Sequence, residues 1–227
     1  MSVLQKTKFT LSVGIDEAGR GCVIGPMVVA VVAADETDRR WFWKNNVRDS
    51  KLVPAKQRDT LAQKIKKRCW FQLKIAQPSE IDRAVIDRSR TLTGLELEQM
   101  SECLKDFCCE FPEREVCAIV DAPSVNAQGY LEKLFMLSGW PDMNSLLAKH
   151  HADKRDRTVA AASILAKSER ERLLARIKKD LGVDFGTGYC HDERTLAHLR
   201  TAKPAAPHIR WTWKTAINRK NKICPPV

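Results

Sequence analysis

Apolar and polar positions alternate along this chain in short blocks of the kind that form strands and helices packed against one another. Residues 8–15 alternate in polarity and residues 26–34 are almost wholly apolar, so both segments are predicted strands. The connection between them is short, which favours an antiparallel pair. Further strands are expected over residues 69–76, 116–120 and 145–151, and the whole pattern is typical of an α/β fold.

Helical spacing of apolar residues predicts helices between and after these strands. Pro54 suits the first turn of a helix that runs to about residue 68, and Thr93 begins a longer helix with an apolar stripe. Residues 158–181 contain no Gly or Pro and are followed by Gly182, so they form the clearest helix of the chain. Shorter helices are expected over residues 78–88, 124–137 and 192–200, and the aromatic residues 41–43 are expected to pack over the sheet edge.

Two adjacent acids lie between the first two predicted strands. Neighbouring side chains on a regular strand point to opposite faces, so Asp16 and Glu17 can serve one site only if the strand ends or bulges there. Gly19 and Gly21 can supply that irregularity, with Arg20 held between them as a fixed cation. By themselves, these residues also fit an ordinary hairpin turn with solvated charges.

Two further acids follow predicted strands, and with the first pair they indicate a metal site. Asp121 ends the fourth strand and Asp153 follows the fifth, at the strand ends where ligand sites of α/β sheets gather. Two unit charges about 4 Å apart repel by about 4 kcal/mol at an effective dielectric of about 20, so clustered carboxylates need cations. Oxygen ligands select Mg²⁺ or Mn²⁺ over zinc.

The charge distribution points to a polyanionic partner. The chain of 227 residues is long enough for one domain with an appendage or for two small domains, and its net charge is +11. Residues 1–148 carry 21 Lys and Arg against 20 Asp and Glu, whereas residues 149–227 carry 18 against 8. The basic surface is therefore expected in the C-terminal third, where it favours nucleic acid over an anionic membrane.

Hydropathy and cysteine spacing argue against other classes of protein. No stretch reaches the roughly 18 apolar residues that a membrane-spanning helix needs, and residues 1–10 lack an apolar signal core. The eight cysteines form no Cys-x-x-Cys pair, and most lie in apolar periodic segments. We therefore expect reduced core cysteines in a soluble, cytoplasmic protein.

A series of short motifs runs in order along nearly the whole chain. The first is the complete run Asp-Glu-Ala-Gly-Arg-Gly at residues 16–21. The others are Asp49-Ser50-Lys51-Leu52, Ile119-Val120-Asp121, Ala152-Asp153 followed by residues 160–167, Gly186-Thr187-Gly188-Tyr189 and residues 210–215. In this order the chain resembles the type 2 ribonucleases H, the ribonuclease HII family, and its spacing is closest to archaeal and eukaryotic catalytic chains. Cys22 and Cys190-His191 depart from the common family pattern.

The resemblance implies a ribonuclease H-like fold, in which a mixed five-stranded sheet is flanked by helices. It implies a catalytic domain over residues 1–182 and a small C-terminal helical extension over residues 183–227 that binds substrate. The implied activity is that of a metal-dependent endonuclease that hydrolyses the RNA strand of RNA/DNA hybrids and nicks at ribonucleotides embedded in duplex DNA. The implied products carry 3′-hydroxyl and 5′-phosphate ends, and the implied cofactor is Mg²⁺ or Mn²⁺ in a two-metal site.

The same resemblance assigns roles to individual residues. The implied catalytic and metal-binding residues are Asp16, Glu17, Asp121 and Asp153. The implied substrate-binding residues are Gly19, Arg20, Gly21, Lys51, Ser163, Lys167 and Tyr189. The backbone of residues 19–21 is implied to sense the 2′-hydroxyl, and Tyr189 to pack on the sugar after the cleaved linkage. The protein is expected to act as a monomer, with companion subunits left open.

Two alternatives remain open at the level of sequence. One is a different nuclease of the same broad fold, such as a type 3 ribonuclease H or an exonuclease with four acids. The other is a non-catalytic module that binds hybrids, against which the intact acids argue. Cleavage of a duplex with one embedded ribonucleotide, with and without Mg²⁺, separates these possibilities.

Overall fold

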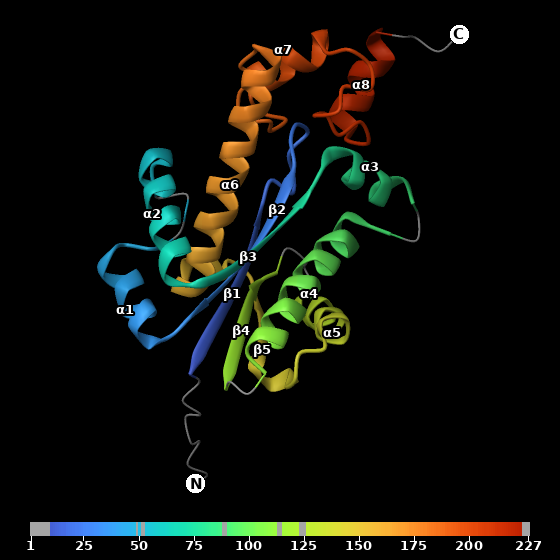
Figure 1. The fold of residues 1–227 in the computed structure, drawn as a ribbon. Coiled ribbons are helices and arrows are strands. Elements are labelled where there is room, and N and C mark those ends of the chain that lie inside the picture. Colours follow the sequence, from blue (N-terminus) through green and yellow to red (C-terminus); the bar gives the residue numbers. More distant parts are fainter. Residues whose placement is uncertain are drawn as a thin grey trace.

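A mixed five-stranded sheet forms the central layer of the protein (Figure 1). The computed structural model describes residues 10–48, 50, 53–87, 90–112, 115–122 and 126–223, with the backbone alone for residues 219–223. The strands are β1 (Leu11–Ala18), β2 (Met27–Ala34), β3 (Trp70–Ala76), β4 (Val116–Asp121) and β5 (Leu146–Lys149). Their order is β3-β2-β1-β4-β5, in which β1 pairs antiparallel with β2 and parallel with β4. The expected mixed sheet is confirmed, and β1 is its middle strand.

Helices cover both faces of this sheet (Figure 1). They are α1 (Glu36–Lys44), α2 (Ala55–Arg68), α3 (Pro78–Ile86), α4 (Leu92–Glu110), α5 (Ala127–Ser138), α6 (Arg157–Leu181), α7 (Glu193–Thr201) and α8 (Lys214–Ile223). One apolar layer joins the sheet to α4 and α5, and the other joins it to α1, α2 and α6. The ribonuclease H-like arrangement expected from the sequence is therefore present.

The side chains of β1 alternate between these two layers. Val13 and Ile15 belong to the layer under α4 and α5, whereas Ala18 belongs to the layer under α6. By the same alternation, Glu17 leaves β1 on the α4 side and Asp16 on the α6 side. All eight residues of β2 are buried, because that strand is covered on both faces.

Gly14 explains why α6 lies directly on the middle strand. A Cβ atom at position 14 would lie 2.2 Å from the carbonyl carbon of Thr158 and 2.3 Å from the nitrogen of Val159. The next residues of α6, Ala160, Ala161 and Ala162, are 0% exposed. The backbone at the start of α6 therefore packs directly against β1. Gly14 and the run of small residues in α6 allow the two backbones to come this close.

Two local predictions from the sequence are wrong. Residues 36–44 form helix α1, which places Phe42 in the core and leaves Trp43 67% exposed, so the aromatic run does not cover the sheet edge as a unit. Strand β1 neither ends nor bulges at Asp16, and it remains paired with β2 through Ala18, which lies opposite Val28. The pairing stays regular because the backbone of these residues continues the antiparallel ladder with β2, whose facing residues are all buried.

The C-terminal segment packs around the far end of α6 (Figure 1). Phe185, Leu199 and Ile209 form a separate apolar cluster with Leu174 of α6 and with Ile24. Helix α8 within this segment was not predicted. The end of α6 coincides with the predicted boundary at residue 182, but the division of the chain into two domains stays a prediction.

Two statements about composition apply to the described residues only. None of their helices is both long and apolar enough to cross a membrane. Their cysteines are unpaired thiols, of which Cys22, Cys69 and Cys103 are buried in the core as expected, whereas Cys109 is exposed.

Candidate active site

The carboxyl ends of β1 and β4 lie side by side at one edge of the sheet, and both carry an acid. Ile15 lies opposite Val120 in this parallel pair, so Asp16 and Asp121 occupy the next positions on two neighbouring strands. Neighbouring strands are about 5 Å apart, which is close enough for strong repulsion between two carboxylates. The sheet register, set by apolar packing, therefore brings together two acids that are distant in sequence.

Asp16 is a buried carboxylate with an unusual proton affinity. It is 5% exposed, its Oδ1 accepts a hydrogen bond from the backbone nitrogen of Glu17 at 2.7 Å, and it also accepts one from Ser163. Burial raises the pKa of Asp16 to about 7, the bond from Ser163 opposes that rise, and the charge of Asp121 adds to it. Near neutral pH this side chain exchanges its proton, and its charged form requires a nearby cation.

Glu17 lies on the other face of β1, beside a buried carboxylate of α4. Burial raises the pKa of Glu17 well above its usual range, and the charges of Asp16 and Glu96 raise it further, while Arg20 opposes this rise. Glu96 is 0% exposed. The sequence pattern did not distinguish Glu96 as a site residue, although a charged residue beside the apolar stripe of α4 was the available signal.

Asp121 connects the end of β4 to the turn that carries Asp153. Its Oδ1 accepts a hydrogen bond from the backbone nitrogen of Ala152 at 3.0 Å. That turn, Ala152–Lys154, begins after His151 in the left-handed conformation, and Asp153 within it is 6% exposed. Burial raises the pKa of Asp121, the bond from Ala152 opposes this rise, and the charge of Asp153 adds to it.

The predicted acids suit a hard divalent cation by their chemistry, although they do not form a closed ligand set. All four are carboxylates, and burial raises the pKa of Asp16, Glu17 and Asp121, so a bound cation would relieve an existing electrostatic cost. Among the described residues, however, no three His, Cys, Asp or Glu side chains converge in a way that would hold one metal ion. The regular geometry of β1 accounts for part of this result, because it directs Asp16 and Glu17 to opposite faces.

A polar network from α6 supports Asp16. The Oγ atoms of Ser163 and Ser50 are 2.9 Å apart, and Lys167 donates a hydrogen bond to Ser50. Both serines are 0% exposed. The charge of Lys167 lowers the pKa of Asp16, and Ser163 donates a hydrogen bond to the same carboxylate, so the two residues act on Asp16 from the one face of α6 that their spacing predicts. Lys51, the predicted neighbour of a phosphate, lies outside the described residues.

The loop after β1 is held by a buried arginine from the C-terminal segment. Arg210 is 0% exposed and donates hydrogen bonds to the carbonyl oxygens of Gly19 at 2.7 Å, Arg20 at 2.8 Å and Gly25 at 2.9 Å. Gly19 has a φ of +84°, and a Cβ atom there would lie 2.4 Å from Nε of Arg170. Arg210 belongs to the last sequence motif, but no pattern in the sequence indicated what its side chain contacts.

Tyr189 lies next to this loop through a shared arginine. Its ring is 5.2 Å from the guanidinium of Arg170, which also packs against Gly19, and 5.5 Å from the ring of His191. Burial raises the pKa of Tyr189 to about 12, and the charge of Cys22 adds to that rise. Cys22 and His191, which both depart from the family pattern, are therefore neighbours of Tyr189.

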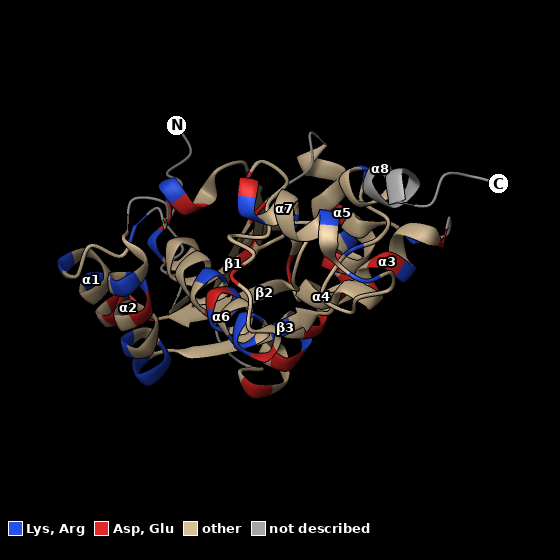
Figure 2. Cartoon of the chain, turned by 90° about the horizontal axis from the view of Figure 1, so that it is seen from above, with Lys and Arg blue, Asp and Glu red and all other residues tan. Residues whose placement is uncertain are grey.

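The basic surface is not confined to the C-terminal third of the chain. Helix α2 carries six Lys and Arg against one Asp, and it lies beside α6, to which Arg58 forms an ion pair with Glu171 (Figure 1). Figure 2 shows basic segments on both α2 and α6. The sequence predicted the contribution of α6 but not that of α2, whose charges are balanced along the chain by the acids of other elements.

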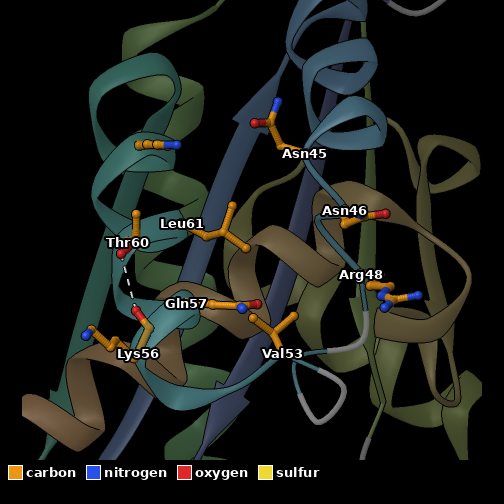
Figure 3. Close-up of a pocket in the computed structure, with 9 residues that line it drawn as sticks. Asn45, Asn46, Arg48, Val53, Lys56, Gln57, Thr60 and Leu61 are labelled. Carbon is orange, nitrogen blue, oxygen red and sulfur yellow. Dashed lines mark hydrogen bonds between the residues drawn. The ribbon is translucent and has the colours of Figure 1, made fainter.

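A pocket opens beside the start of α2 (Figure 3). It has a volume of about 480 Å³ and is lined by Asn45, Asn46, Arg48, Val53, Lys56, Gln57, Thr60, Leu61 and Lys64. Its three cations and its amides suit an anion such as a backbone phosphate. None of the four predicted acids lines it, so it is separate from the candidate active site.

The fold and the site together define a ribonuclease H-like enzyme, with acids at the carboxyl ends of neighbouring parallel strands of a mixed sheet. The family model described as Ribonuclease HII matches residues 13–216. The chain therefore belongs to the ribonuclease HII family, whose members are endoribonucleases, and it is a hydrolase of this class.

Individual relatives support this assignment. The ribonuclease HII of Archaeoglobus fulgidus is 38% identical over 216 residues, which cover 93% of this chain and 98% of that protein. The crystal structure of ribonuclease H2 from Pyrococcus horikoshii OT3 is 29% identical, covers 95% of this chain and 100% of that one, and has a TM-score of 0.81. The crystal structure of Bst-RNase HIII in complex with Mn²⁺ has a TM-score of 0.79 at 16% identity, covers 95% of this chain and 71% of that one, and shares the fold.

Proposed function

We propose that this enzyme cuts the RNA strand of RNA/DNA hybrids and nicks duplex DNA at single embedded ribonucleotides. The observation that carries the proposal is the pair Asp16 and Asp121, held in register at the ends of two parallel strands beside the loop of residues 19–21. The products would carry 3′-hydroxyl and 5′-phosphate ends. The enzyme would act as a monomer, because every proposed site residue comes from this one chain. It would act within the cell, because its DNA substrate lies there.

The four acids Asp16, Glu17, Asp121 and Asp153 would hold Mg²⁺ or Mn²⁺, a role that their all-oxygen chemistry supports. When bound as a pair, such ions activate the attacking water and stabilise the leaving 3′ oxygen. Asp16 would lose its proton on metal binding, because its pKa of about 7 keeps it partly protonated near neutral pH. Ser163 and Lys167 would then stabilise the charged form of Asp16 through the hydrogen bond and the positive charge already present.

The ribose would be recognised by the loop of residues 19–21. A Cβ atom at Gly21 would meet no described atom within 4 Å, so the need for glycine there does not come from the described part of the protein. That open space supports close approach of a sugar to the backbone, while the side chain of Arg20 points to α4. Contact between this backbone and the 2′-hydroxyl would distinguish RNA from DNA.

The next sugar would pack on Tyr189, which is joined to the same loop by Arg170. The C-terminal segment thus supplies both Tyr189 and Arg210 to this region, which supports a role in substrate binding for residues 183–227. The pocket beside α2 and the basic residues of α2 and α6 would bind phosphates at a distance from the cut. We also propose that Lys51 contacts a phosphate, and only its sequence motif supports this role.

The decisive experiment is cleavage of a duplex that contains one ribonucleotide, with and without Mg²⁺. We expect wild-type protein to nick it only with metal, and Asp121→Asn to lose turnover while it still binds the duplex. Asp180→Asn, which changes an exposed carboxylate of α6, serves as the matched control and should cut normally. Near wild-type turnover by Asp121→Asn in Mg²⁺ would exclude Asp121 from the site, and metal-independent nicking would refute the proposed chemistry.

The role of Tyr189 is tested by single-turnover cleavage of two duplexes, one with a single ribonucleotide and one with uninterrupted RNA. Tyr189→Ala should lose far more activity on the first duplex than affinity for it, and Tyr189→Phe should keep more activity if the ring face is what matters. Equal rates for wild type and Tyr189→Ala on the single ribonucleotide would reduce Tyr189 to loop packing.

A further inference from the structure

A buried carboxylate of α4 holds the side chain of Arg20. Nε of Arg20 donates a hydrogen bond to Oε2 of Glu96 at 2.7 Å, and Nη2 donates one to Oγ1 of Thr93 at 2.9 Å. The side chain of Glu96 is 0% exposed and that of Arg20 is 32% exposed. The second oxygen of Glu96 accepts a hydrogen bond from the hydroxyl of Tyr130 at 3.1 Å. Glu96 is thus fixed by Tyr130 on one side and fixes Arg20 on the other.

Arg20 is therefore held at both ends. Its carbonyl oxygen is bonded to Arg210, and its guanidinium is bonded to Glu96 and Thr93 of α4. A planar guanidinium bonded at two of its nitrogens has little freedom to rotate. The backbone between Gly19 and Gly21 is consequently clamped between the C-terminal segment and α4, with its conformation set by contacts on both sides.

The same contacts determine which acid Arg20 neutralises. The side chain of Glu17 leaves β1 on the α4 side. There the charge of Arg20 lowers the pKa of Glu17, and the charge of Glu96 raises it. Because the charge of Arg20 already lowers the pKa of Glu17, an arginine released from Glu96 would be free to form an ion pair with Glu17. It would then compete with any divalent cation that Glu17 helps to hold.

We propose that Glu96 is a positioning residue for hydrolysis: it fixes Arg20, and through it the ribose-sensing loop of residues 19–21, and it keeps Arg20 from forming an ion pair with Glu17. This inference rests on the proposed function and deepens it, because it adds a residue that touches neither substrate nor reacting atoms. The contrasting role is purely structural, in which Glu96 is a buried ion-pair partner whose loss lowers stability alone.

Glu96→Gln separates these two roles, because glutamine keeps the size and still accepts hydrogen bonds but carries no charge. The matched control is Glu98→Gln, the same change two residues further along α4, where Glu98 is an exposed partner of Arg90. We expect Glu96→Gln to reduce single-turnover cleavage of the single-ribonucleotide duplex about tenfold, the scale of one charge-assisted hydrogen bond. The ratio of its affinities for that duplex and for all-DNA duplex should fall as well, and Glu98→Gln should match wild type in both.

Metal binding gives a readout that does not depend on cleavage. Titration calorimetry of Mn²⁺ into substrate-free protein should show weaker binding by Glu96→Gln, by several-fold, and unchanged binding by Glu98→Gln. Thr93→Val removes the other tether of Arg20 and leaves the charge of Glu96 in place. If Glu96→Gln does not fold, Thr93→Val is tested in its place, and we expect it to show the same kind of loss of ribonucleotide preference, but a smaller one.

A double-mutant cycle tests whether Glu96 acts through Arg20. If it does, Glu96→Gln has no further effect on cleavage once Arg20 is replaced in Arg20→Gln. Additive losses would overturn the inference, and so would an unchanged ribonucleotide preference in a folded Glu96→Gln. Failure of wild-type protein to cut the single-ribonucleotide duplex refutes the proposed function instead, whereas normal cutting by both wild type and Glu96→Gln refutes only the role of Glu96.

Discussion

Replacement of Asp16 by asparagine should make the metal-free protein more stable at alkaline pH while it abolishes cleavage. Asp16 is buried beside Asp121, and its pKa is raised from 3.8 to about 7, chiefly by burial. A carboxyl group whose pKa is raised by folding contributes its full stability below the unfolded pKa, and this contribution is lost as the pH rises through the folded pKa. Above pH 7 the wild-type protein therefore folds against the cost of a buried negative charge.

The size of the effect follows from that difference in pKa. A rise of this size corresponds to about 4 kcal/mol in the free energy of unfolding, at about 1.4 kcal/mol for each pH unit. Asparagine cannot ionise, yet its carbonyl can still accept the hydrogen bond from the nitrogen of Glu17. We expect Asp16→Asn to gain about 3 kcal/mol, or roughly 10 °C in Tm, at pH 8 and close to nothing at pH 4.

The assay is thermal and urea unfolding of wild type, Asp16→Asn and the control Asp180→Asn, each in chelator at pH 4, 6 and 8. The control changes an exposed carboxylate of α6, so its unfolding curve should follow that of wild type at every pH. Added Mg²⁺ or Mn²⁺ should stabilise wild type more than Asp16→Asn and so narrow the gap. A gain in stability that is the same at pH 4 and pH 8, or absent at pH 8, would refute the assignment of the cost to the charge of Asp16.

Three further predictions concern other parts of the molecule. Lys167→Ala should weaken binding to hybrid duplex and reduce the slope of log binding constant against log salt concentration by roughly 0.7 to 0.9, because one phosphate is no longer neutralised. An unchanged slope in binding titrations would mean that Lys167 only supports Ser50. Burial lowers the pKa of His208 to about 4, so the stability that its neutral form contributes is present above pH 6.5 and lost as the pH falls through about 4. His208→Phe can still stack on Phe185, so its free energy of unfolding, measured in urea, should fall less at acid pH than that of wild type. Arg210→Gln should lower the free energy of unfolding by about 3 kcal/mol or more because it leaves buried carbonyl groups without donors, and a change below about 1 kcal/mol would contradict this reasoning.

Local patterns in the sequence predicted most of the strands and helices for simple physical reasons. The continuous apolar run of β2 is a strand covered on both faces, and the long segment ending at Gly182 is a helix closed by a left-handed glycine. Asp16 was found because it stands with Glu17 between two segments that are predicted strands, and Asp121 because it ends a short apolar run. In these cases the burial of a segment depends on its own spacing of apolar residues.

Contacts between distant segments were beyond the reach of such patterns. Glu96 lies beside an apolar helical stripe, and only the packing of α4 against the loop after β1 shows that its charge meets Arg20. The charges of α2 are diluted along the chain by acids elsewhere, so they formed no basic region until the fold placed α2 beside α6. Helix α1 was missed because its nine residues hold no apolar residue outside the run Trp41, Phe42 and Trp43, and it is stabilised by the burial of Phe42.

The sequence by itself determined which residues are proposed for the chemistry: the acids at the predicted strand ends, the glycines of the loop after β1 and the basic side chains. Only the tertiary structure decided how they are arranged. The register of β1 against β4 places Asp16 beside Asp121, and the regular pleat of β1 sends Glu17 to the opposite face, against the expectation of a bulge. The physical reason is that register and pleat are set by the burial of apolar side chains over the whole sheet, a cooperative property that no single segment contains.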